Sequence, residues 1–337
     1  MTIPSTHGSA THEQAPAWLN TLIDAAHRTW HGAGTSQDRA RFAEFEVQRL
    51  YGGRNNPLYR FRPPGGRWFC LKLHLVDDRQ RAQREWQALR LLSGRGEPAV
   101  PCPVHYRPSD SRPALVMEFL DGAPLGDRSL GPARLAALRA ALQAMYTITP
   151  DKVHEPMLEV VTTAAGMIER MRERWAVLAG KPPVDGTRAA LLDAWRAWNA
   201  GPDPQSLSAS APAVFGRGDP SLGNCLWDGH RVALVDFEYA GWTDRAFELG
   251  DLVEHPQSRA TPDTTWEQLI EGFGLTDQER ARYMAARRLL CFFWLARWWA
   301  ATDQPDTTAR FAAQAERAQQ LLADVLRRPQ DRYPSGP

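Results

Sequence analysis

Three oxygen-bearing side chains, Asp219, Asn224 and Asp236, occur at spacings that suit phosphoryl transfer. Asn224 follows Asp219 by five residues, and Asp236 follows Asn224 by twelve, at the end of the apolar run VALV. Phosphoryl transfer needs a carboxylate that orients or deprotonates the acceptor hydroxyl, and oxygen ligands for the Mg²⁺ that neutralises the phosphates. We therefore predict the first role for Asp219 and the second for Asn224 and Asp236.

Two short apolar runs, 224–228 and 231–237, flank Gly229 and predict two strands that carry these groups to one end of a hairpin. The overlapping tripeptide Arg217-Gly218-Asp219 would be an adhesion ligand only on an extracellular surface. Residues 1–16 lack the basic start and the apolar run of a secretory signal. We therefore expect a cytoplasmic protein and interpret the tripeptide as incidental.

Phosphoryl transfer also needs a cation for the α- and β-phosphates, and Lys72 in the strand-like run FCLKLHL is a candidate. Glu85 lies thirteen residues later in a run with helical periodicity, a spacing that permits a strand-to-helix ion pair with Lys72. Gly52 and Gly53, in the turn between the first two predicted strands, would allow backbone N–H groups to approach a nucleotide.

Taken together, these motifs resemble the aminoglycoside phosphotransferase and choline kinase group, small-molecule relatives of the protein kinases, over roughly residues 44–300. The resemblance implies that Asp219 is the base, that Asn224 and Asp236 bind the metal, and that ATP or GTP is the phosphate donor with Mg²⁺. It also implies an interlobe connector whose backbone binds adenine. That connector matches Met117, Glu118, Phe119 and Leu120.

The chain departs from the family pattern at two positions near the catalytic motif. Arg217 stands where the family usually has His, and Glu238 follows Asp236-Phe237 where protein kinases have Gly. We place Arg217 with the catalytic residues, and the sequence leaves open whether it changes turnover or holds a second anion. Glu248 falls where the family has an acidic residue that braces the catalytic loop from a helix.

Each of these residues alone has an ordinary structural explanation, because Asp in a Gly-Pro turn and Lys in a strand are commonly solvated. Their joint occurrence in one order favours a kinase. The alternative is a nucleotide-binding regulatory pseudokinase without turnover, which the Arg217 departure permits. A protein kinase is disfavoured because no A-P-E segment follows Asp236, and the P-loop and G-x-S-x-G motifs are absent.

The order of predicted elements indicates an α+β, bilobal, protein-kinase-like fold. We expect an N-terminal tail and helix over 1–40, a nucleotide-binding N-lobe with an antiparallel sheet and one helix over 41–122, and a helical C-lobe over 123–337 that holds the catalytic loops and the acceptor site. The Gly/Pro/Ser-rich stretch 201–213 is expected to interrupt the helices of the C-lobe.

The composition limits the partners of the protein. A formal net charge of +1 gives no electrostatic footprint for nucleic acid. The most apolar segment has eight residues between Arg288 and Arg297, too short to cross a membrane, and its tryptophans, Trp294, Trp298 and Trp299, are expected in the core. The four cysteines lie far apart and are expected as separate core residues. The sequence leaves the oligomeric state open.

The acceptor is expected to be a small molecule with a hydroxyl group. Residues 236–280 contain eleven Asp or Glu and three Arg, which favours a cationic acceptor such as an aminoglycoside or amino alcohol. A solvated acidic surface explains the same pattern equally well. If the acceptor is cationic, the first candidates for its contacts are Glu238, Asp251 and Glu254, with cation–π support from Tyr239, Trp242 or Trp266.

Overall fold

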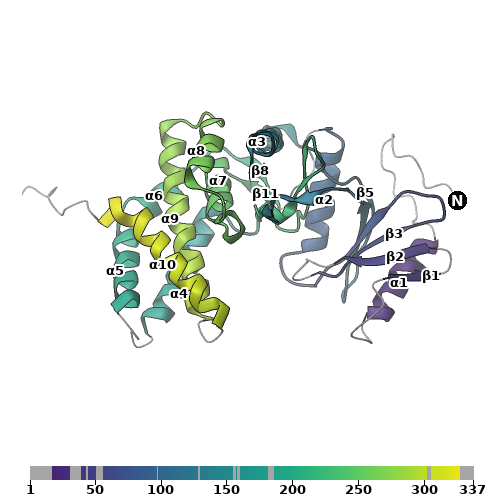
Figure 1. The fold of residues 1–337 in the computed structure, drawn as a ribbon, viewed down its shortest axis with the longest axis horizontal. Coiled ribbons are helices and arrows are strands. Elements are labelled where there is room, and N and C mark those ends of the chain that lie inside the picture. The colour runs from purple at the N-terminus through teal and green to yellow at the C-terminus, as the bar shows by residue number, and fades with distance from the viewer. Residues whose placement is uncertain are drawn as a thin grey trace, which may run out of the picture. The chain divides into compact units, whose positions relative to one another are not determined.

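The computed structural model describes residues 17–30, 39–42, 45–50, 56–96, 98–127, 130–154, 157, 160–180, 186–301 and 305–326. These residues form two compact units (Figure 1). Unit 1 comprises the described residues up to Trp86 together with Pro101–Phe119, and unit 2 comprises Gln87–Val100 and the described residues from Leu120 onward. The predicted α+β organisation, with a sheet-containing N-lobe and a helical C-lobe, is confirmed.

Unit 1 is built on a six-stranded antiparallel sheet with the order β1-β2-β3-β4-β6-β5. Successive side chains along each strand point to opposite faces of the sheet. Their bounds are Arg39–Phe42 (β1), Phe45–Leu50 (β2), Leu58–Arg62 (β3), Phe69–Leu73 (β4), Pro103–Arg107 (β5) and Ala114–Glu118 (β6).

Helix α1 (Ala17–Trp30) covers one face of this sheet (Figure 1). Leu19, Leu22 and Ile23 recur at helical spacing and join a core with Phe69 and Leu71 of β4. Because alternate residues of a strand point to opposite faces, Lys72 of β4 lies on the face away from α1.

Helix α2 (Arg81–Ser93) follows β4 and runs from unit 1 into unit 2. Ala82, Leu89 and Leu92 recur at helical spacing and are buried, and Trp86 stacks on Tyr106 of β5 at a centroid distance of 6.0 Å. The segment after α2 belongs to unit 2 because the backbone N–H of Leu234 donates to the carbonyl of Ala99 at 2.8 Å.

Helix α9 (Asp277–Trp299) is the longest helix of the described part of unit 2, and it packs against α4, α6, α7 and α10 (Figure 1). Helix α9 begins at a capping box formed by Thr276 and Glu279. The other bounds are Pro132–Tyr146 (α3), Ala164–Ala179 (α4), Gly186–Ala200 (α5), Asp203–Ser208 (α6), Arg245–Glu254 (α7), Asp263–Glu271 (α8) and Pro305–Leu326 (α10). Trp175, Trp198 and Phe292 lie at the centre of this core.

Short strands in unit 2 place the predicted catalytic segments. Strands β9 (Cys225–Trp227) and β10 (Val232–Leu234) form the predicted hairpin, to which β7 (Ala123–Pro124) adds a third strand. A further pair, β8 (Val214–Gly216) and β11 (Gly241–Thr243), was not predicted from the sequence. Three-residue strands are too short to show a periodicity.

The stretch 201–213 contains a short helix, α6, where the sequence predicts only a break. The carboxylate of Asp203 accepts hydrogen bonds from the Trp198 indole at 2.8 Å and from two nitrogens of Arg288, at 2.5 and 2.8 Å. These contacts fold the segment onto the helices before and after it. Composition alone could not show this, because Arg288 lies eighty-five residues away. Helix α8 was also missed.

The four cysteines are free, as expected from their spacing, and Cys70, Cys225 and Cys291 are buried, whereas Cys102 is half-buried. Trp299 is buried as predicted, but Trp294 and Trp298 are only half-buried and stack on each other. None of the helices in the described part of the chain has the length and apolar character needed to cross a bilayer.

Candidate active site

The β9–β10 hairpin brings Asn224 and the segment of Asp236 together. Cys225 pairs with Leu234, so the residues just outside the ladder, Asn224 and Val235, face each other. The backbone N–H of Val235 donates to the carbonyl of Asn224 at 3.0 Å. The two proposed metal ligands, twelve residues apart in sequence, therefore leave the same end of one hairpin, as predicted.

Asp236 has a left-handed backbone, with φ at 66°. Such a conformation costs a non-glycine residue about 1–3 kcal/mol and persists only where the surrounding structure enforces it. The next residue, Phe237, is fully buried, and its carbonyl accepts the N–H of Ala240 at 3.0 Å. The turn therefore holds the Asp236 side chain at a fixed place beyond the hairpin.

The loop that carries Asp219 packs tightly on the segment after Asp236. Gly218 has φ at 67°, and a Cβ at this position would lie 2.4 Å from the carbonyl oxygen of Tyr239. A Cβ at Gly216 would lie 2.3 Å from Cγ2 of Thr243. Only glycine permits these approaches, so the two glycines bring the Asp219 loop against the segment that follows Asp236.

Glu248 of α7 braces this loop, as the family resemblance predicts. Its carboxylate oxygens accept the backbone N–H groups of Arg217 at 3.2 Å and of Gly218 at 2.9 Å. Burial raises the pKa of Glu248, while these N–H groups and the Arg217 guanidinium act to lower it. Asp244 fixes the start of α7 by accepting the N–H of Phe247 at 2.9 Å.

Arg217, the residue in place of the family His, is 0% exposed. Its Nη1 donates to the backbone carbonyl of Asn224 at 3.0 Å. Burial acts to lower its pKa, but the neighbouring Cys225, Glu248 and Asp219 raise it above the ordinary value, so the guanidinium is charged. Arg217 therefore links the start of the loop to its end.

The Asp219 carboxylate is oriented from within its own loop. Its Oδ1 accepts the backbone N–H of Ser221 at 3.3 Å, and the carbonyl of Ser221 accepts the N–H of Asn224 at 3.0 Å. Ser221 therefore connects the proposed base to the proposed metal ligand. Sequence reasoning missed this residue, because a serine in a turn carries no distinguishing signal.

Asp251 and Glu238, two of the acids proposed for acceptor contacts, both lie in unit 2. Asp251 is half-buried on α7, one turn after Glu248. Burial, followed by the carboxylates of Glu248 and Asp219, raises its pKa well above the ordinary range. Asp251 therefore lies on the helix whose Glu248 holds the backbone of the Asp219 loop. Glu238 is buried, and its role stays a prediction.

Glu254 is not retained as an acceptor contact. Its side chain is 0% exposed, and its carboxylate oxygens receive Arg287 at 2.8 Å, Arg259 at 3.2 Å and Arg317 at 3.0 Å. A carboxylate that binds three guanidinium groups in the interior is a structural element of the helical core. The sequence-based prediction was wrong because the partners Arg287 and Arg317 come from α9 and α10.

The acidic segment 236–280 is much less negative in the fold than in the sequence. Four of its eleven acids bind arginines; these are Asp244, Glu254, Asp263 and Glu279. Trp266 is also removed as a cation–π candidate, because it is 1% exposed and its indole donates to the carbonyl of Ser258 at 3.3 Å. Trp242 is half-buried and packs edge-on against Phe215.

Unit 1 contains the predicted strand-to-helix ion pair. Nζ of Lys72 lies 2.7 Å from Oε2 of Glu85, and both side chains are buried. Nε2 of His74 lies 3.2 Å from the same carboxylate oxygen. Burial acts to raise the pKa of Glu85, but Lys72 and His74 outweigh it and lower the pKa. Sequence analysis missed His74, which lies two residues after Lys72 and one residue beyond the end of β4.

The predicted interlobe connector coincides with a boundary between the units, which falls between Phe119 and Leu120. Met117 pairs with Cys70 of β4, and the N–H of Glu118 donates to the carbonyl of Cys102 at 2.8 Å. Gly52 and Gly53, predicted to approach the nucleotide, lie outside the described residues.

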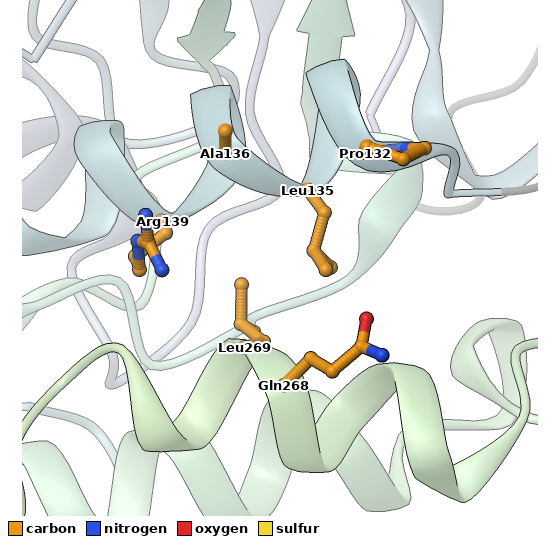
Figure 2. Close-up of a pocket in the computed structure, with 6 residues that line it drawn as sticks. All are labelled: Pro132, Leu135, Ala136, Arg139, Gln268 and Leu269. Atoms are coloured by element: carbon orange, nitrogen blue, oxygen red, sulfur yellow. The ribbon is translucent and has the colours of Figure 1, made fainter.

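A separate groove of about 230 Å³ lies between α3 and α8. Figure 2 shows Leu135 of α3 and Leu269 of α8 facing each other across it, with Arg139 and Gln268 beside them. Its six lining residues include no carboxylate and none of the residues of the Asp219 loop, so the groove is not part of the proposed metal site.

The sequence profile of the phosphotransferase enzyme family, abbreviated APH, matches residues 46–290 of the chain. The chain belongs to this family. The matched range includes Lys72, Glu85, Asp219, Asn224 and Asp236. This phosphotransferase therefore carries the predicted motif residues within the family region, and the predicted resemblance is confirmed. No curated protein matches the chain.

Solved structures similar to this phosphotransferase include a choline/ethanolamine kinase family protein from Mesorhizobium loti, with 21% identity and a TM-score of 0.59 over 89% of this chain and 95% of that one. Macrolide 2'-phosphotransferase MphH from Brachybacterium faecium has 18% identity and a TM-score of 0.56, over 93% of this chain and 100% of that one. The aminoglycoside phosphotransferase APH(4)-Ia, as a variant in complex with ADP and hygromycin B, has 16% identity and a TM-score of 0.56, over 82% and 93%. At these identities the likeness establishes the protein-kinase-like fold.

Proposed function

We propose that the protein is an ATP- or GTP-dependent, Mg²⁺-dependent phosphotransferase that transfers the γ-phosphoryl group to a hydroxyl of a small molecule. The observation that carries this proposal is the convergence of Asn224 and the Asp236 segment at one end of the β9–β10 hairpin, joined through the hydrogen bond between Val235 and Asn224. The Asp219 loop ends at the same Asn224.

The residues at this hairpin fit a magnesium ion, because an amide oxygen and a carboxylate are ligands that Mg²⁺ accepts. Asn224 and Asp236 would hold the ion, which when bound neutralises charge on the phosphates. Asp219 would accept the proton of the acceptor hydroxyl and orient its oxygen. Ser221 and Glu248 would keep the Asp219 loop in place through the hydrogen bonds described above.

Unit 1 would bind the nucleotide. Lys72 would contact the α- and β-phosphates, and Glu85 would hold Lys72 through the 2.7 Å ion pair. The backbone of the connector from Met117 to Leu120 would bind the adenine, and the glycines at 52 and 53 would approach the phosphates. The complex of a similar aminoglycoside phosphotransferase with ADP and hygromycin B supports a nucleotide donor and a small-molecule acceptor.

Asp251 is the first candidate for contact with the acceptor, because it lies near the Asp219 loop and its pKa is raised. An ammonium group beside it would favour the ionised carboxylate. Glu238, two residues after Asp236, is the second candidate. The overall acidity of 236–280 adds little support for a cationic acceptor, since four of its acids already bind arginines.

The test is a turnover screen of the purified protein. MgATP and MgGTP are each supplied with aminoglycosides, macrolides, amino alcohols, nucleosides and sugars, and phosphorylated product is detected by ³¹P NMR and mass spectrometry. We expect one acceptor class to consume nucleotide, and Asp219→Ala to remove that activity. A thermal shift with MgATP but no product from any acceptor would favour the regulatory pseudokinase instead.

A further inference from the structure

Gln257, a residue with no predicted role, contacts the loop between Asp219 and Asn224. It lies in the short 3₁₀ helix η4 (Pro256–Ser258) that follows α7. Its side-chain Oε1 accepts the backbone N–H of Gly223 at 2.8 Å and also the hydroxyl of Ser221. The side-chain amide of Gln257 must point its oxygen at Gly223, because the backbone N–H of Gly223 can only donate a hydrogen bond.

Ser221 transmits this contact to both proposed functional residues. Its backbone N–H donates to the Asp219 carboxylate at 3.3 Å, and its carbonyl accepts the N–H of Asn224 at 3.0 Å. Its hydroxyl oxygen also accepts the N–H of Gly223 at 3.2 Å. The Oε1 atom of Gln257 is therefore connected through Ser221 to both the proposed base, Asp219, and the proposed metal ligand, Asn224.

Hydrogen bonds within the chain around Gln257, and two glycines beside its side chain, favour this contact. The backbone N–H of Gln257 donates to Nδ1 of His255 at 3.3 Å, and the hydroxyl of Ser258 donates to the carbonyl of Leu252 at 2.5 Å, which fixes η4 to the end of α7. A Cβ on Gly223 would lie 3.0 Å from Oε1 of Gln257, and one on Gly126 would lie 3.3 Å from it. Two glycines thus leave room for the side chain.

We propose that Gln257 is a positioning residue that fixes the Asp219–Asn224 loop for phosphoryl transfer. This inference rests on the proposed function, because it assigns Gln257 a role at the same site. The side chain is exposed and belongs to no apolar cluster among the described residues, so its removal takes little from the core. Removal of the Gln257 side chain should therefore change the geometry of the loop and lower turnover, with little effect on folding stability.

The deciding variants are Gln257→Ala, which removes the acceptor oxygen, and Gln257→Glu, which keeps an acceptor oxygen at the same place. Gln319→Ala on α10 is the matched control, since Gln319 is also an exposed helical glutamine. Ser221→Ala, alone and combined with Gln257→Ala, completes a double-mutant cycle for the shared hydrogen bond.

We expect Gln257→Ala to lower kcat by about 10- to 100-fold, because small displacements of reacting groups are that costly. The KM for the nucleotide and the thermal midpoint should stay near those of the unaltered protein. Gln257→Glu should restore most of kcat, and the double variant should lose less than the product of the single losses. Unchanged kcat in Gln257→Ala would overturn the proposal, as would a loss that follows global destabilisation.

A second measurement does not depend on turnover. Hydrogen–deuterium exchange of the loop amides, followed by mass spectrometry on peptides that cover 218–225, should become about fivefold faster in Gln257→Ala, as expected for one lost hydrogen bond. Gln257→Glu and Gln319→Ala should exchange like the unaltered protein. If no acceptor is phosphorylated, the proposed function fails, and the exchange experiment alone tests Gln257. Faster exchange of the loop amides in Gln257→Ala would then show that Gln257 fixes the loop. Unchanged exchange in that variant would overturn this role.

Discussion

The guanidinium of Arg217 and the backbone carbonyl of Asn224 are joined by a hydrogen bond of 3.0 Å in the interior of unit 2. The same carbonyl accepts the N–H of Val235 next to Asp236. A buried, charged side chain thus contacts the backbone where the Asp219 loop meets the hairpin. Arg217, which departs from the family pattern, therefore helps to fix the backbone of the proposed site.

Arg217→Met should therefore lower both stability and turnover. The variant keeps an unbranched but shorter side chain, and it leaves Glu248 without its buried cationic neighbour, which we expect to cost about 3 kcal/mol of unfolding free energy. The value of kcat should fall by at least about tenfold, because Asn224 loses a contact that orients it. Denaturant unfolding and steady-state kinetics measure the two effects, and Arg196→Met on the surface of α5 is the control. Full turnover in Arg217→Met would contradict this role.

Asp219→Asn should lower kcat by about 10²- to 10⁴-fold, the usual contribution of a positioned base. The amide cannot accept the acceptor proton, but it retains an oxygen for the N–H of Ser221. The thermal shift produced by MgATP should persist, because Asp219 is not assigned to the nucleotide. Asp193→Asn, exposed on α5, provides the comparison. An equal loss of MgATP binding would instead place Asp219 among the nucleotide contacts.

Lys72→Met should raise the KM for ATP and lower kcat, since it removes the cation proposed for the phosphates. It also leaves Glu85 buried beside His74 without its nearest cation. Combining it with Glu85→Gln should cost less than the sum of the single effects in a double-mutant cycle, because the two side chains share one ion pair. Lys152→Met in the exposed η2 segment (Pro150–Lys152) controls for loss of charge. Additive single effects would show that the pair does not act as a unit.

Glu254→Gln should destabilise the protein by about 3 kcal/mol, because Arg287, Arg259 and Arg317 would lose their shared buried carboxylate. The KM for the acceptor should not change once the protein is folded. Thermal unfolding and acceptor kinetics are compared with Glu267→Gln, an exposed position on α8. A raised acceptor KM with unchanged stability would return Glu254 to the acceptor site.

Acid should weaken the contact between α7 and the start of α9. The hydrogen bonds from Arg245 to Glu279, at 2.6 and 2.7 Å, are the largest cause that lowers the pKa of Glu279 to about 2. A lowered carboxylate pKa adds stability above its unfolded value of about 4.3, and this stability is lost as the pH falls toward 2.

Glu279→Gln should therefore cost about 2 kcal/mol at pH 7, after allowance for solvent screening of a partly exposed pair. The difference from the unaltered protein should narrow between pH 5 and pH 3. Denaturant unfolding across this range tests the expectation. A difference that does not depend on pH would show that the capping hydrogen bonds, and not the ion pair, carry the effect.

The parts of the site that could be predicted from sequence are those whose spacing is local. Asn224 and Asp236 lie on either side of one hairpin, marked in the sequence by two apolar runs around Gly229, and Lys72 and Glu85 lie in consecutive elements, so local sequence was enough to place them. The confirmed organisation of sheet and helices followed from the same periodicities.

Contacts between distant segments could not be predicted in this way. Gln257 lies thirty-four residues from Gly223, and Arg317 lies sixty-three residues from Glu254. Tertiary packing selects these partners, and a single sequence carries no periodic signal for them. Counting acids in 236–280 overstated the charge available to a ligand for the same reason.

At Asp236 the proposed chemistry and the backbone favour different residues. The proposed metal site needs a carboxylate, whereas the left-handed backbone favours glycine. Glycine would adopt φ at 66° without the steric cost of a Cβ, so Asp236→Gly would relieve strain while it removes the carboxylate. A library of variants sorted only for resistance to heat would therefore tend to discard this aspartate. Part of the folding stability of the chain is therefore given up at the residue that we propose as a metal ligand.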